Sequence, residues 1–189
     1  MGTRGAIGFI KNGVEKVTYN HFDSYPSGVG IAVAGYCRRT TIKAMNKAFD
    51  KLVLVTEEAS PTKEQQKQLN KYLSTSVSSG KPEEWYALLR ETQGDLVEIV
   101  NCGFMIDSKE FLLDSLFCEY AYIINLDTNM LEVYKGSQKD PDKGAGRYVG
   151  QKAENGREYF GVSLVKEIPL KAKDIADQVL SVGREEDEE

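Results

Sequence analysis

The chain has 189 residues, of which 41% are hydrophobic and 28% charged, and its formal net charge is -5 at pH 7. This composition is typical of one folded globular domain, and no apolar run approaches the roughly 20 residues that a membrane-spanning helix needs. The negative charge argues against broad, sequence-independent binding of nucleic acid. We expect a cytoplasmic protein without a signal peptide or a membrane partner.

Three scattered cysteines, Cys37, Cys102 and Cys118, lack the paired spacing of a zinc site or of a disulfide framework. They are typical of buried thiols in a reducing compartment. We therefore predict no metal site and no cofactor. The predicted organisation is one α+β domain over residues 1–183, followed by an acidic, disordered tail at residues 184–189.

The chain begins with a predicted β-hairpin. Two short runs rich in β-forming residues, at residues 6–11 and 14–19, are joined by Asn12-Gly13, which is the strongest short-range signal for a hairpin turn. Residues 29–49 then carry apolar side chains at helical spacing. We predict a helix there, interrupted near residues 39–41.

Short strands and helices alternate in the middle of the chain. We predict a strand at residues 52–56 and then a helix from Ser60-Pro61 to about residue 74. A helix at residues 82–92 and a strand at residues 96–100 follow. The next predicted element is a helix at residues 111–116, preceded by a capping box of Asp107 and Glu110.

The last third of the chain is predicted to form mainly strands. A second hairpin is predicted from strands at residues 120–126 and 130–134, and a strand at residues 159–167 and a helix at residues 171–182 follow. We expect both hairpins to belong to one sheet. The predicted fold is therefore α+β, with a largely antiparallel sheet covered by helices.

A long segment from Gly136 to Arg157 shows no useful periodicity. Loops of this length are uncommon in compact domains and are either functional lids or mobile excursions. The segment contains five basic residues that would attract an anionic ligand: Lys139, Lys143, Arg147, Lys152 and Arg157.

The candidate site lies near the start of the chain, around its only histidine, His21. If residues 14–23 are extended, Tyr19, His21 and Asp23 project to one face, and Tyr25 follows them. A carboxylate beside an imidazole sets its tautomer and raises its pKa, and tyrosine hydroxyls both donate and accept hydrogen bonds. This combination suits a proton shuttle or a phosphate-recognising pocket.

Two further features favour an anion at this place. Ser27-Gly28-Val29-Gly30 is predicted to begin a helix, whose unpaired N–H groups and dipole attract negative charge. Arg4, on the first strand, would supply a bidentate positive charge. The predicted ligand-binding residues are Arg4, Tyr19, His21, Tyr25, Gly28, Gly30 and Arg147, and the catalytic residues, if the protein is an enzyme, are His21 and Asp23.

A purely structural interpretation of the same residues also stands. Asp23 or Ser24 would then only cap the helix, Tyr25-Pro26 would form a rigid turn, and the lone histidine would be a satisfied structural residue.

The motif Met-Gly-Thr-Arg, followed by Tyr19-x-His21-x-Asp23-x-Tyr25-Pro26-x-Gly28-x-Gly30, resembles a family of uncharacterised proteins from phages, bacteria and fungi. The resemblance extends to residues 117–122, 131–136 and 146–148, and it leaves out residues 51–100. It implies an accessory phage protein that acts in the host cytoplasm, and it implies no particular reaction.

Three functional hypotheses follow. The first is a protein that binds a nucleotide or another phosphorylated small molecule, for example to sequester a host signalling nucleotide. The second is a hydrolase or phosphoryl-type enzyme in which His21, paired with Asp23, acts as general acid or base. The third is an interaction module that inhibits a host protein through its surface.

Overall fold

The computed structural model describes residues 2–154 and 158–184. The predicted acidic tail, apart from Arg184, and the basic residue Arg157 lie outside the described residues. None of the helices in the described part of the chain has the length and apolar character needed to cross a membrane.

The N-terminal hairpin is confirmed. Strands β1 (Gly5–Lys11) and β2 (Val14–Asn20) pair antiparallel around Asn12 and Gly13, whose φ angles of 52° and 72° are those of a tight hairpin turn. The Asp127 carboxylate accepts hydrogen bonds from both turn N–H groups, at 2.7 and 3.2 Å. Because Asp127 belongs to the turn of the second hairpin, these bonds join the two hairpins at one end of the sheet.

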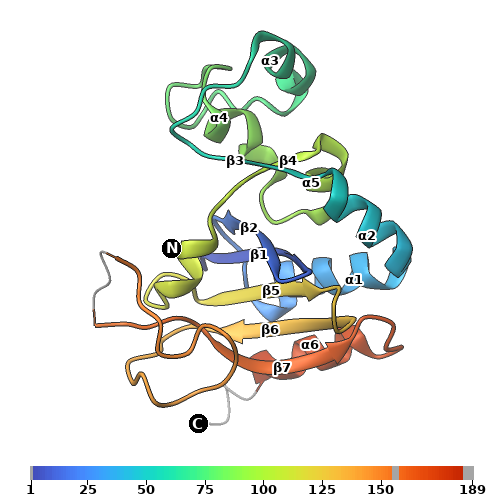
Figure 1. The fold of residues 1–189 in the computed structure, drawn as a ribbon, viewed down its shortest axis with the longest axis vertical. Helices are drawn as coiled ribbons and strands as arrows, with labels where there is room; N and C mark the ends of the chain where they lie inside the picture. Colours follow the sequence, from blue (N-terminus) through green and yellow to red (C-terminus); the bar gives the residue numbers. More distant parts are fainter. Residues whose placement is uncertain (1, 155–157, 185–189) are drawn as a thin grey trace.

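A five-stranded sheet forms the centre of the molecule (Figure 1). Its order is β2-β1-β5-β6-β7, with β5 at Tyr120–Asn125, β6 at Met130–Lys135 and β7 at Ser163–Pro169. Within this sheet the β1–β5 pair is parallel and the other three pairs are antiparallel. The α+β class and the placement of both hairpins in one largely antiparallel sheet are confirmed.

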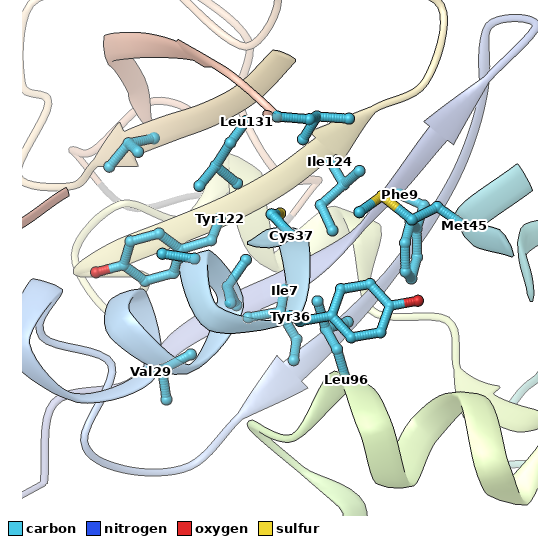
Figure 2. Close-up of a cluster of buried hydrophobic side chains, with 14 of the residues drawn as sticks. Ile7, Phe9, Val29, Tyr36, Cys37, Met45, Leu96, Tyr122, Ile124 and Leu131 are labelled. Atoms are coloured by element: carbon cyan, nitrogen blue, oxygen red, sulfur yellow. The ribbon is translucent and has the colours of Figure 1, made fainter. Parts of the chain in front are cut away.

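One face of the sheet is covered by helices α1 (Ile31–Arg39) and α6 (Ile175–Arg184), and η1 (Pro26–Gly30) leads into α1. The main core lies here. Figure 2 shows Ile7 and Tyr122 from the sheet beside Val29 and Cys37 from the helical layer. The break predicted near residues 39–41 is confirmed, because α2 (Ile42–Lys51) begins at a new N-cap, Thr41.

The opposite face is covered differently from the prediction. Its cover is η4 (Lys109–Leu113), a short 3-10 helix, together with parts of the long segment after β6. From these, Leu112, Tyr148 and Val162 are buried against the sheet. The long segment is therefore anchored through Tyr148 rather than fully exposed to solvent.

A smaller helical layer extends beyond the β2 edge (Figure 1). It contains the short parallel pair β3 (Val53–Val55) and β4 (Phe104–Ile106), and its small core centres on Trp85 and Leu88. Its helices are α3 (Lys63–Leu69), η2 (Asn70–Tyr72), α4 (Trp85–Leu89), η3 (Arg90–Thr92) and α5 (Leu96–Cys102).

Four local predictions are wrong, and the first is the helix at residues 111–116, where the structure has the shorter 3-10 helix η4. The strand predicted at residues 96–100 is helix α5, because the Asp95 carboxylate caps it by accepting from the N–H groups of Val97 and Glu98. The Asp107–Glu110 capping box is absent from the described contacts, since Ser108 is the N-cap of η4 and has no side-chain cap bond. The N-cap of α3 is Thr62, which forms a capping box with Gln65, rather than Ser60.

The three cysteines are free, buried thiols, as predicted.

Candidate functional site

The corner after β2 is built from buried polar contacts. The Ser24 N–H donates to the Thr3 carbonyl (3.1 Å), the Asn20 amide donates to the Ser24 hydroxyl (2.7 Å), and the Tyr122 hydroxyl donates to the Ser24 carbonyl (2.9 Å). Thr3, Asn20 and Ser24 are all buried. These residues of the motif thus have a structural role, which is to hold the N-terminal segment against the corner.

The same corner separates Asp23 from His21. The extended backbone ends at Asn20, and Asp23 adopts a left-handed conformation with φ 56°. Among the residues that the structure describes, Asp23 makes no hydrogen bond or ion pair with His21. The predicted His21–Asp23 pair is therefore not formed, because strand alternation does not extend past Asn20.

Arg4, Tyr19 and His21 do come together, on the face of the sheet that lies away from α1 and α6. Tyr19 pairs with Ala6 of β1, whose side chain belongs to that face, and its ring packs edge-on against Phe111 at 4.9 Å. The Tyr19 hydroxyl forms a 2.9 Å hydrogen bond with His21 Nδ1. Arg4 is near enough to act electrostatically on both side chains.

Arg90 completes this group, and sequence reasoning missed it. It belongs to η3 in the smaller helical layer beyond β2, and its guanidinium lies over the Phe22 ring, 5.4 Å from the ring centroid. The Nη1 group donates to Gln93 Oε1 at 2.7 Å. No local sequence signal marks Arg90, because its proximity to His21 depends on how the helical layer packs.

We call Arg4, Tyr19, His21, Phe22 and Arg90 the arginine patch. His21 and Phe22 are exposed, and Arg4 and Arg90 are partly exposed. No carboxylate within residues 2–154 and 158–184 forms an ion pair with either guanidinium. The Glu119 carboxylate accepts a hydrogen bond from the backbone N–H of Arg4, at 3.3 Å, and is not within ion-pair distance of its guanidinium. The patch therefore carries positive charge that the described part of the chain leaves without an ion-pair partner.

The electrostatics of the patch disfavour a charged imidazole. Partial burial, followed by the positive charges of Arg90 and Arg4, lowers the pKa of His21 below its ordinary value of 6.5. Burial is the main cause that raises the pKa of Tyr19, and the two arginines oppose it only in part. At neutral pH the patch therefore presents two guanidinium cations, a neutral imidazole and a protonated phenol.

A titration of His21 tests this arrangement. Because the chain has one histidine, its imidazole gives a single set of NMR signals. We expect a pKa below 6.5 in the wild-type protein and a higher pKa in Arg90→Ala, since removal of a nearby cation makes protonation easier. An unchanged pKa in Arg90→Ala would show that Arg90 does not act on His21.

Tyr25, Gly28 and Gly30 do not join the patch. Tyr25 borders a cavity of about 120 Å³ with Glu119 and Lys135. The N–H groups of Gly28 and Gly30 both donate to the Tyr25 carbonyl, at 3.0 and 3.2 Å, so they are not free to bind an anion as predicted.

The two glycines are explained by close packing. A Cβ atom on Gly28 would lie 2.3 Å from the Asp23 carbonyl oxygen, and one on Gly30 would lie 2.9 Å from the Tyr122 hydroxyl. Both positions thus exclude larger side chains for structural reasons.

Arg147 also lies outside the arginine patch, and its guanidinium binds Glu132 and Tyr134. Its Nη2 group is 2.5 Å from Glu132 Oε1, and its Nε group donates to the Tyr134 hydroxyl at 3.2 Å. Glu132 is buried near the middle of the sheet. The predicted role of Arg147 in ligand binding is therefore replaced by an observed role in anchoring the long segment after β6.

Two other cavities differ sharply in charge. One, of about 310 Å³, follows the carboxyl ends of β3 and β4 and is lined mainly by acidic side chains: Glu57, Glu58, Asp107 and Glu110. The other, of about 340 Å³, is lined by Arg38, Lys171, Ala172 and Lys173. The basic cavity is therefore the main alternative to the arginine patch as a binding site for an anionic ligand.

Comparison of the chain with protein-family models, with curated proteins and with solved structures gives no match.

Proposed function

We propose that this protein binds a nucleotide or another phosphorylated small molecule at the arginine patch. The observation that carries the proposal is that Arg4 and Arg90, from distant parts of the chain, both lie near the Tyr19–His21 pair, with no described carboxylate paired to either guanidinium. Like charges brought together raise the free energy of the unliganded protein. A bound dianion would relieve that repulsion.

The chemistry of the side chains suits a phosphoryl group. Guanidinium groups bind phosphate oxygens in a bidentate, charge-assisted manner. If the Tyr19 hydroxyl donates to His21 Nδ1, the neutral imidazole carries its proton on Nε2 and offers one further donor. The patch then supplies donors from three side chains, and none of its five residues is acidic.

Alanine variants test the proposal with pyrophosphate as the first probe, measured by calorimetry. Loss of one charge-assisted contact is worth about 1.5–3 kcal/mol, so we expect Arg4→Ala and Arg90→Ala each to weaken binding at least tenfold. Arg38→Ala removes a cation from the competing basic cavity and should leave binding unchanged. If Arg38→Ala weakens binding and the two patch variants do not, the ligand binds at the basic cavity and the proposal is wrong.

A second candidate function is hydrolysis or transfer of the phosphoryl group. It is favoured by the neutral imidazole, which is the protonation state that a general base requires. Tyr19, rather than Asp23, would orient this base: its hydroxyl would accept from Nδ1–H, which is the opposite direction to the bond in the binding tautomer and leaves Nε2 free to take a proton. An enzyme would release product from the samples used for binding, His21→Ala would bind ligand without turnover, and Asp23→Asn would remain active. Unchanged ligand in every sample would exclude this candidate.

Sequestration of a signalling nucleotide requires only tight binding and an intact ligand. If no phosphorylated ligand binds and the patch variants keep the biological activity of the protein, inhibition of a partner protein through its surface is the function that remains.

A further inference from the structure

We propose that the ligand of the arginine patch is a nucleotide whose base stacks on Phe22. This inference rests on the proposed function and narrows the ligand from any phosphorylated molecule to one that also carries a flat aromatic ring.

Among the phenylalanines of the described residues, Phe22 alone is exposed, at 48%, whereas Phe9 and Phe49 are buried. Exposure of a large apolar ring to water is unfavourable, and this ring stands beside the Arg90 guanidinium and the His21 ring rather than alone. The backbone of Phe22 is fixed in place, since its carbonyl accepts a hydrogen bond from the buried Asn20 amide. The ring is therefore presented from a structured corner.

The neighbours of Phe22 are those of a stacking site. Arg90 lies over its ring, and the His21 ring stands nearly perpendicular to it, with centroids 6.1 Å apart and an interplanar angle of 89°. A second pair of this kind lies in the same region, where the Arg4 guanidinium is 4.5 Å from the Phe117 ring centroid. Alternation of aromatic rings with arginine side chains is typical of surfaces that bind bases and phosphates together.

The alternative ligands use only part of this surface. Inorganic phosphate or a sugar phosphate would engage the guanidinium groups and leave Phe22 in water. A long single strand of nucleic acid would need an extended basic path, which the net charge of -5 disfavours. A single nucleotide matches both the charge and the exposed ring.

Calorimetry with ribose 5-phosphate and with the four ribonucleoside 5′-monophosphates isolates the contribution of the base. Because base stacking on an aromatic ring is substantial, we expect at least one nucleotide to bind about tenfold or more tightly than ribose 5-phosphate. Phe22→Ala should lower the affinity for that nucleotide to the level of the sugar phosphate and leave the affinity for the sugar phosphate unchanged.

Three controls distinguish stacking from a general disturbance. Phe22→Leu keeps an apolar side chain without a π-face and should behave like Phe22→Ala, whereas Phe22→Tyr should retain the preference for the nucleotide. Tyr25→Ala removes an aromatic ring that is 47% exposed, a few residues away and outside the patch, and it should change nothing.

The possible outcomes separate this inference from the proposed function. Equal affinities for nucleotides and ribose 5-phosphate, or an equal loss of both in Phe22→Ala, would overturn the stacking role and leave phosphate binding intact. Failure of all these ligands and of pyrophosphate to bind would overturn both. Much tighter binding of a short oligonucleotide than of any mononucleotide would identify a single strand as the ligand and would also overturn the inference.

Discussion

Arg147→Ala is expected to lower the free energy of unfolding by about 3 kcal/mol, because it leaves a buried carboxylate without its cation. Glu132 is only 2% exposed, and the Arg147 guanidinium forms an ion pair with its carboxylate. Its remaining partners are the Asn125 amide and the Tyr134 hydroxyl, both at 2.7 Å, and neither is charged.

Thermal or denaturant unfolding measures this loss, which corresponds to a drop in Tm of about 6–12 °C for a chain of this size. Lys143→Ala breaks the exposed Lys143–Asp140 pair and should change stability by less than about 0.5 kcal/mol. In the Arg147→Ala background, Glu132→Gln should recover part of the loss, because it removes the unpaired charge. Equal effects of Arg147→Ala and Lys143→Ala would show that the buried pair does not anchor the segment after β6.

Gly5→Ala is expected to destabilise the protein by about 3 kcal/mol, at the upper end of the usual cost of overpacking. The added Cβ would lie 2.2 Å from the Tyr120 carbonyl oxygen and 2.7 Å from the Ser24 Cβ atom. Neither neighbour can rotate away, since one is strand backbone and the other belongs to a buried corner. Separation of β1 from β5 at this point would also disturb the segment that carries Arg4.

The matched substitution is Gly13→Ala in the hairpin turn. Its φ angle of 72° makes alanine unfavourable by about 1–2 kcal/mol, but no atom lies within 4 Å of the added Cβ. Unfolding in denaturant should therefore show that Gly5→Ala lowers the free energy of unfolding clearly more than Gly13→Ala does. A smaller loss of unfolding free energy for Gly5→Ala than for Gly13→Ala would mean that β1 and β5 can move apart at Gly5 at little cost.

The elements predicted correctly are those determined by neighbouring residues. Asn12-Gly13 forms the turn of the first hairpin, and the alternation at residues 120–126 and 130–134 predicts the second, since turn geometry and strand alternation act over a few residues. The sequence predicts a strand where α5 forms, because Leu96-Val-Glu-Ile-Val is rich in β-branched residues. Its cap at Asp95 was the available signal, and it outweighed the β-propensity of the run.

In the candidate site, too, some residues are placed by the local sequence and others by tertiary contacts. Tyr19 and His21 form the contact that their two-residue spacing predicts, although β2 itself ends at Asn20, so this part of the site follows from the local sequence. Asp23 departs from that face because Asn20 and Ser24 fold the chain into a corner through buried bonds with Thr3 and Tyr122.

The remaining features were decided only by the tertiary structure. The parallel pairing of β1 with β5 brings together residues more than a hundred positions apart, and Arg90 reaches Phe22 only when the helical layer has packed beside the sheet. Arg147 is drawn to Glu132 because a buried carboxylate needs a cation. Such contacts depend on burial and on the packing of distant segments, which local propensity and spacing do not encode.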